Sequence, residues 1–252
     1  MDLAGATIDE LFALARAAEE EDAYWDCVSE LHTRVDEHTF RIADVLCDSF
    51  ATGERCLGAD VLGQLGAVEG QTAAEGPFAS ASGRVLLRLL EDDEPAVLSS
   101  AAIGLGHLRD ERSIHRLIAL APHGSAEVRR AVVHGLMGYD DDRAVRALVA
   151  LSADADASVR DWATFALGVQ IDRDTPELRD ALAARLEDRD ADTRDEAIRG
   201  LARRGDPRAI DAAVAAEPAP HVAEALRLLA DSTDDPRVPE RLAELEDDPQ
   251  NS

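Results

Sequence analysis

A ten-residue pattern, V-R-x-x-A-A-x-A-L-G, recurs along the chain and limits its fold more than any other feature. The clearest copy is VRDWATFALG at 159–168, and further copies begin at Glu54, Val97, Val128, Thr193 and, more weakly, at His221 or Val222. The second position of the pattern falls at Arg55, Leu98, Arg129, Arg160 and Arg194, so the first step is 43 residues and the later steps are 31, 31 and 34. A near-constant step of this length is typical of stacked helix-turn-helix repeats.

A second apolar segment precedes the copies of the pattern, at 84–90, 113–120, 143–151 and 177–186. Its Leu, Ile and Val residues recur at spacings of three and four, which predicts an amphipathic helix. Short acidic junctions such as 91–94 separate the two helices of a repeat, and Asp there can cap the helix that follows. Asp206-Pro207 and Asp235-Pro236 provide a cap followed by proline at the first helical position. Each repeat is therefore predicted to be a pair of helices.

The composition agrees with helices rather than sheets. Hydrophobic residues make up 46% of the 252 residues but aromatic residues only 4%. Such an interior must consist mainly of Ala, Leu and Val, which suit closely packed helices. We therefore expect an all-α protein.

The pattern resembles the HEAT-like repeats of the phycobilin-lyase type, which are widespread in bacterial proteins, over residues 54–230. Leu98, Met137 and Ala202 depart from it but keep its register. The resemblance implies a right-handed α-solenoid, an α-α superhelix of HEAT-like repeats, with the pattern helices on the concave face and the preceding helices on the convex face. The same repeats serve scaffolds, inhibitors and a few enzymes, so they do not by themselves assign a function.

Three regions are predicted along the chain. Residues 1–53 form an N-terminal helical cap and the first outer helix, with helices expected at 8–18, 23–31 and 39–50. Residues 54–230 form the repeat array, with a Gly-, Ala- and Ser-rich inserted loop at 67–83. Residues 231–252 form an acidic C-terminal helix or tail.

Charge argues against nucleic acid as a direct partner. The 52 acidic residues exceed the 26 basic ones and give a net charge of -26, which repels a phosphate backbone. The three cysteines are an odd number without a CxxC pair, and no apolar stretch approaches the length of a membrane span. We expect a cytoplasmic protein that does not bind membranes.

The helical spacing predicts which side chains face the concave groove. Trp162 and Phe165, three residues apart on one helix, are predicted to be the centre of a contact with a partner. An alternative is that both rings only fill space between helices. The further partner-binding candidates are Ile103, His107, Arg130, His134, Asp161, Arg199, Arg203 and Arg227. The last three arginines could instead exchange surface ion pairs with Asp195, Glu196 and Glu224.

No motif in the chain indicates catalysis. The sequence has no GxSxG motif, no phosphate-binding loop, no HExxH motif and no His-Glu pair. We therefore predict no catalytic residue, no metal and no cofactor. The preferred interpretation is a non-catalytic scaffold or adaptor that binds a peptide, a helix or a basic protein. Two alternatives stay open: an inhibitor or immunity-type protein that neutralises a basic partner, and a phycobilin-lyase-like subunit.

Overall fold

The computed structural model describes residues 3–67 and 72–246. Every regular element in these ranges is helical, and the chain divides into two compact units, Met1–Leu136 and Met137–Ser252. The prediction of an all-α protein is confirmed. The boundary between the units lies inside the predicted array of 54–230 rather than at either of its ends.

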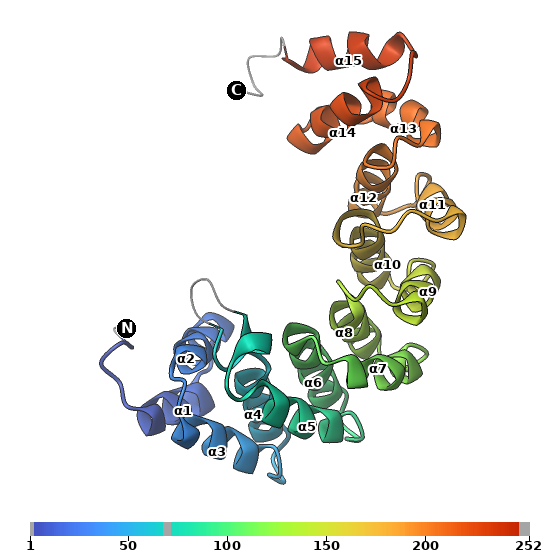
Figure 1. Ribbon diagram of the computed structural model, residues 1–252. Helices are drawn as coiled ribbons and strands as arrows, with labels where there is room; N and C mark the ends of the chain where they lie inside the picture. The colour runs from blue at the N-terminus through green and yellow to red at the C-terminus, as the bar shows by residue number, and fades with distance from the viewer. Residues whose placement is uncertain (1–2, 68–71, 247–252) are drawn as a thin grey trace. The chain divides into compact units, whose positions relative to one another are not determined.

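The first unit stacks helix pairs side by side. In chain order it contains α1 (Ile8–Ala17), α2 (Glu21–Thr33), α3 (Glu37–Leu46), α4 (Thr52–Gln64), the 3-10 turn η1 (Ala73–Glu75), α5 (Ala79–Leu89), α6 (Pro95–Leu108), the 3-10 turn η2 (Glu111–Ser113), α7 (Ile114–Leu120) and α8 (Ala126–Leu136). The pattern helices α4, α6 and α8 pack against one another in a row, with α3, α5 and α7 on one side of that row (Figure 1).

The second unit repeats this arrangement. It contains α9 (Asp142–Leu151), α10 (Ala157–Phe165), the π-helical turn η3 (Ala166–Gln170), α11 (Pro176–Ala183), α12 (Ala191–Ala202), the 3-10 turn η4 (Pro207–Ala209), α13 (Ile210–Ala215), α14 (Pro220–Ala230) and α15 (Arg237–Glu246). Here α10, α12 and α14 are the pattern helices, and α9, α11 and α13 are their preceding helices (Figure 1).

The apolar positions of the pattern form the core. Val159, Ala163 and Leu167 are completely buried in the second unit. Asp156 and Asp190 cap the pattern helices α10 and α12 by accepting hydrogen bonds from backbone N–H groups in the first turn. The acidic junctions of the sequence therefore fix where each pattern helix begins.

The arginine in the second position of the pattern links successive repeats. Arg160 donates from Nε and Nη2 to the two carboxylate oxygens of Asp188, at 2.9 and 2.8 Å. Arg55 makes the same two-pronged contact with Asp92, at 2.8 and 3.0 Å. Each aspartate lies in the turn that precedes the next pattern helix, so the pair fixes one repeat against the next.

Two predicted boundaries were wrong. The helix expected at 39–50 runs from Glu37 to Leu46, since Ser49 and Phe50 lie in a turn where their carbonyls accept from Arg55. The loop expected at 67–83 is also shorter, because Ala73–Glu75 is a 3-10 turn and α5 begins at Ala79. Residues 68–71 of that loop lie outside the described residues.

Candidate partner-binding face

An aromatic pair lies on α10 in the second unit. The rings of Trp162 and Phe165 meet edge to face, with centroids 5.7 Å apart and an interplanar angle of 86°. Both side chains are half-buried. This geometry places the positive edge of one ring against the negative face of the other and fixes both rings in place. The pair therefore combines exposed apolar area with a rigid shape.

Two carboxyl groups with raised pKa values interact with each other, that of Asp161 on α10 and that of Glu196 on α12. Burial, followed by the negative charges of Glu196, Asp192 and Asp190, raises the pKa of Asp161 to about 6. Burial also raises the pKa of Glu196 on α12, although Arg199 opposes that shift through an ion pair at 3.1 Å. The negative charges of Asp161 and Glu196 are thus held close together, and the positive charge of Arg199 compensates them only in part.

A histidine on α14 joins this group. His221 Nε2 lies 3.1 Å from Asp195 Oδ2 on α12. The charge of His221 acts on Glu196 as well, in the direction that lowers the pKa of that carboxyl. We call the four residues Asp161, Trp162, Phe165 and Glu196 the aromatic-acidic face; the Asp195–His221 pair lies beside it.

The three arginine candidates of this unit do not form a separate basic patch. Arg199 pairs with Glu196, Arg203 lies 3.7 Å from Asp172, and Arg227 pairs with Glu246 at 2.8 Å. Each guanidinium therefore has a carboxylate neighbour, but only Glu196 is among the partners expected from the sequence. Exposed pairs of this kind contribute little to stability.

A π-helical turn directly follows Phe165. Its backbone is held by Arg204, whose Nη2 donates to the carbonyls of Leu167 at 2.9 Å and Ile171 at 2.6 Å. Nη1 of the same residue donates to Gly168 at 3.0 Å and Gly200 at 2.8 Å. Turns of this type are frequent at functional sites, and here the turn fixes the end of the helix that presents the aromatic pair.

The remaining candidates lie in the first unit. Ile103 is 38% exposed, His107 and Arg130 are exposed, and His134 is half-buried. Desolvation by the surrounding protein atoms is the main cause that lowers the pKa values of both histidines, with Arg109 adding to it at His107 and Arg130 at His134. Both histidines belong to the first unit, whereas the aromatic-acidic face belongs to the second.

One polar group of the first unit was not predicted as a site. Tyr24 on α2 donates a 2.6 Å hydrogen bond to the carboxylate of Asp60 on α4, and burial raises the pKa of that carboxyl. His32 Nε2 lies 3.0 Å from the backbone oxygen of Asp60. Tyr24 and His32 precede the repeats, so the pattern contains no signal that would place them beside Asp60.

Three further observations concern metal binding, cysteines and membrane spans. In the described ranges, no group of three or more His, Cys, Asp or Glu side chains is arranged to hold a metal ion. Cys27, Cys47 and Cys56 are all free thiols. No helix of the described part is long and apolar enough to cross a membrane.

A chain of helix pairs, in which each pair is one repeat and packs on the next, is an α-solenoid. The HEAT-repeat family model matches residues 83–168 and 150–230, which together make up more than half of the chain. The chain therefore belongs to the HEAT-repeat family.

Solved structures with the same fold are distant in sequence. YibA of E. coli is 20% identical, with a TM-score of 0.74, and the match covers 97% of this chain and 94% of that protein. The complex of CpcE and CpcF of phycocyanin lyase from Nostoc sp. PCC7120 is 18% identical, with a TM-score of 0.53 and coverages of 95% and 94%. The Cnd3–Cnd2 condensin subcomplex of S. pombe is 16% identical, with a TM-score of 0.62, and covers 95% of this chain but 33% of its own. No curated protein matches the sequence. At these identities the similarities show the fold alone.

Proposed function

We propose that this protein is a non-catalytic binding scaffold that holds a segment of another protein on the aromatic-acidic face. The observation that supports this most strongly is the half-buried Trp162–Phe165 pair beside Asp161, a carboxyl whose pKa is raised to about 6. Tryptophan, with tyrosine and arginine, is enriched among the residues that contribute most to the binding energy of interfaces.

The charges favour a basic segment as the occupant. A lysine or arginine side chain placed near Asp161 and Glu196 would relieve the repulsion that raises their pKa values. The same cation can lie over the face of an indole ring, which adds a favourable cation–π interaction. A basic peptide or helix with at least one bulky apolar residue fits both features.

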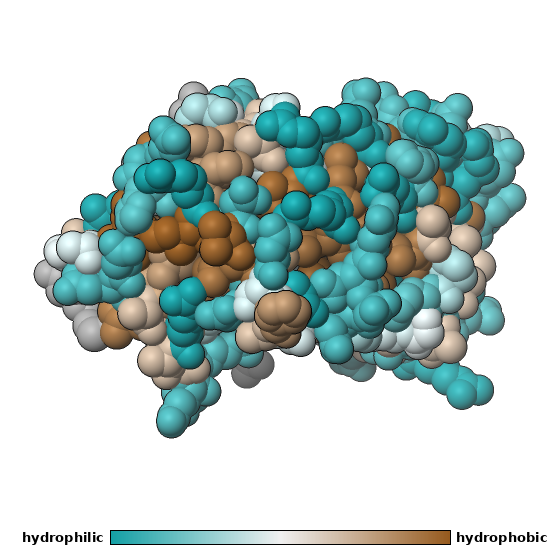
Figure 2. All heavy atoms as spheres, turned by 90° about the horizontal axis from the view of Figure 1, so that it is seen from below, coloured by the Kyte–Doolittle hydropathy of each residue, from teal (hydrophilic) through white to brown (hydrophobic). Residues whose placement is uncertain are grey.

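A second candidate is an inhibitor that neutralises a basic partner. The net charge of -26 supports it, since a strong field of one sign speeds association with a partner of the opposite sign. Figure 2 shows hydrophilic residues over most of one face of the protein, with hydrophobic residues between them. Fast, salt-sensitive binding to a single basic protein would distinguish an inhibitor from an adaptor that binds several partners.

The remaining parts of the proposal concern location and chemistry. We place the protein in a reducing cytoplasm because its three thiols are unpaired, and we assign it neither nucleic acid nor membrane as a direct partner.

A phycobilin-lyase-like subunit is the third candidate. That activity would require a bound bilin, so visible absorbance in protein purified from its native source would favour it over the scaffold.

A peptide library tests the proposed contact directly. We expect immobilised peptides containing Lys or Arg next to a bulky apolar residue to bind the wild-type protein in preference to peptides with Glu at the same positions. The Trp162→Ala variant should lose this preference, while Trp25→Ala, which removes a 41% exposed tryptophan from α2, should keep it. Equal binding of basic and acidic peptides would contradict the proposal.

A further inference from the structure

The pattern helices α6 and α8 of the first unit present exposed side chains beside their closest approach. A Cβ atom on Gly106 would lie 2.7 Å from the backbone oxygen of His134, so the two helices touch at this level. Ile103 lies one turn before His107 on α6, and both side chains are exposed. Arg130, also exposed, lies one turn before His134 on α8, so these side chains are neighbours across the contact. We call Ile103, His107 and Arg130 the apolar-basic face.

Arg130 is a cation without a counter-charge. Within the part of the chain that the structure describes, its guanidinium makes no hydrogen bond and no ion pair. Glu127, one turn earlier on α8, is exposed and does not pair with it in that part of the chain. The arginine candidates of the second unit differ, because each lies beside a carboxylate: Arg199, Arg203 and Arg227.

His107 adds a second basic group to this face. Its ring makes no hydrogen bond or ion pair among the described residues. Desolvation and then the charge of Arg109 lower the pKa of His107, and His107 in turn acts on the pKa values of His134 and of His32 on α2. Asp60, on the pattern helix α4 that packs on α6, does not act on the pKa of His107. A carboxylate from outside would therefore meet basic groups that lack an acidic partner.

Ile103 adds apolar area beside these groups. Its side chain is 38% exposed. A single exposed isoleucine is common on protein surfaces. Its place beside two basic groups without acidic partners indicates a ligand that carries both a negative charge and an apolar group.

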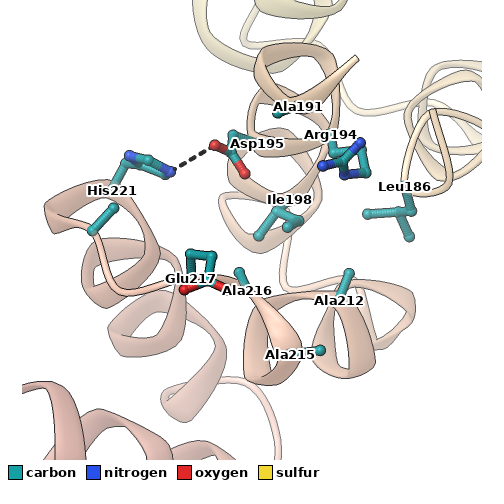
Figure 3. Close-up of a pocket in the computed structure, with 11 residues that line it drawn as sticks. Leu186, Ala191, Arg194, Asp195, Ile198, Ala212, Ala215, Ala216, Glu217 and His221 are labelled. Carbon is teal, nitrogen blue, oxygen red and sulfur yellow. Dashed lines mark ion pairs between the residues drawn. The ribbon is translucent and has the colours of Figure 1, made fainter. Parts of the chain in front are cut away.

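A hollow in the second unit shows the opposite situation. It has a volume of about 450 Å³ and lies among residues of α12, α13 and α14 (Figure 3). Arg194 shares this hollow with the carboxylate of Glu217. His221 Nε2 lies 3.1 Å from Asp195 Oδ2, as the dashed line in Figure 3 marks. The chain itself supplies the anions there, whereas Arg130 and His107 have none.

We propose that the apolar-basic face binds an acidic segment of a partner protein. An aspartate or glutamate of that segment contacts Arg130 and His107, and a bulky apolar residue next to it covers Ile103. The net charge of -26 does not prevent this contact, because exposed charges more than about 8 Å apart are largely screened at physiological salt. The inference does not depend on the aromatic-acidic face, since it concerns another unit and a ligand of opposite charge.

The contact should become stronger as the pH falls from 8 to 6. A carboxylate beside His107 favours the protonated ring, so the complex takes up a proton when it forms. The carboxylate itself stays ionised in this range, because the pKa of glutamate is about 4.3. At pH 8 the ring of His107 is uncharged, and acidic peptides should bind weakly. The preference of the aromatic-acidic face for basic peptides is therefore measured at pH 8.

NMR on the full chain tests the contact with the probe N-acetyl-Glu-Leu-Glu-amide. The Cε1–Hε1 signal of His107, assigned by its absence in His107→Gln, should shift saturably. The dissociation constant should be at least about fivefold lower at pH 6 than at pH 8. Arg130→Gln should raise it at least about tenfold at pH 6, the effect of losing a charged hydrogen bond. The matched control is Arg41→Gln, which removes an exposed arginine of α3 without an ion pair in the described ranges and should leave binding unchanged.

Several results would overturn the proposal. They are the absence of a saturable shift at pH 6, equal shifts with the neutral peptide N-acetyl-Gln-Leu-Gln-amide, and equal affinities of wild type and a folded Arg130→Gln variant. A shift that grows with protein concentration alone would show that a second copy of the chain is the occupant and would also overturn it. Trp162→Ala should leave the binding unchanged, and a loss in that variant would assign the acidic peptide to the aromatic-acidic face instead.

Discussion

Gly168, in the π-helical turn η3 that follows α10, and Gly200, on α12, meet so closely that a Cβ atom on Gly200 would lie 2.7 Å from the Cα of Gly168. Gly63 and Gly104 meet in the same way between α4 and α6, where a Cβ on Gly63 would lie 2.6 Å from the Cα of Gly104. No side chain fits at these crossings. Glycine in the pattern therefore sets the distance between successive pattern helices, and with it the spacing of the side chains that they present.

We expect Gly200→Ala to lower the free energy of unfolding by about 1 to 3 kcal/mol, because the added methyl group overpacks the crossing with Gly168. Alanine favours helices more than glycine does, by about 1 kcal/mol. A loss of stability would therefore show that overpacking outweighs this helix preference, and a gain would show the reverse. Urea denaturation followed by circular dichroism measures it. Gly53→Ala, where a Cβ meets nothing within 4 Å, is the control and should be neutral or stabilising.

The Arg160–Asp188 pair should contribute measurably to stability. Its side chains are only 14% and 6% exposed, and hydrogen bonds that involve charged groups contribute about 1.5 to 3 kcal/mol. We expect Arg160→Gln to lower the free energy of unfolding by that amount at pH 7. Arg189→Gln, which removes an exposed arginine from the same turn, should change it by less than about 0.5 kcal/mol.

The pair also predicts a dependence on pH. The hydrogen bonds from Arg160 are the main cause that lowers the pKa of Asp188 below its ordinary value. A carboxyl with a lowered pKa in the folded state adds stability above its unfolded pKa, and this stability is lost as the pH falls through the folded value. The difference between wild type and Arg160→Gln should therefore shrink in denaturation curves measured towards pH 3. A difference that stays constant down to that pH would contradict the assignment.

Asp161 should show the opposite dependence. Its pKa is raised to about 6 in the folded protein, so its charged form destabilises the fold as the pH rises through that value. We expect Asp161→Asn to raise the melting temperature at pH 8 and to lose most of this advantage at pH 5. The exposed Glu187 provides a control, since Glu187→Gln should give the same small change at both pH values. A constant gain for Asp161→Asn would mean that its charge is not the cause.

Arg204 should contribute more to the free energy of unfolding than its neighbour Arg203. Replacing Arg204 with Met leaves the carbonyls of Leu167, Gly168, Ile171 and Gly200 without their donor. Unsatisfied buried groups cost about 1 to 3 kcal/mol each, so we expect a loss of at least about 2 kcal/mol in thermal or urea denaturation. Arg203→Met, at an exposed position, should cost much less. Equal losses would show that the π-helical turn does not depend on Arg204.

The repeat pattern was sufficient to predict the fold because the residues that form, cap and bury the helices recur in each repeat. The paired helices, their caps and the apolar positions follow from residues within about 31 positions of one another, as at Val159, Ala163 and Leu167. The pattern also identified the arginine at position 160, but not its function, because Asp188 becomes its partner only when two repeats are stacked.

The site was less predictable for a physical reason. Helical spacing identified Trp162, Phe165 and Asp161 as neighbours on one helix, but the raised pKa of Asp161 depends on burial and on Glu196 in another helix. Tyr24 and Asp60 are joined by one hydrogen bond across 36 residues, and no repeated feature relates them. The choice of the aromatic-acidic face as the contact stays a prediction.

Affinity capture from the native extract, with quantitative mass spectrometry, tests the binding role most directly. The baits are wild type, a Trp162→Ala/Phe165→Ala double variant and Trp25→Ala, each shown to be folded by its helical circular dichroism and cooperative melting. We expect at least one protein with a basic segment to be retained by wild type and by Trp25→Ala and to be lost from the double variant. Retention of the same proteins by all three baits would contradict the aromatic-acidic face as the binding site.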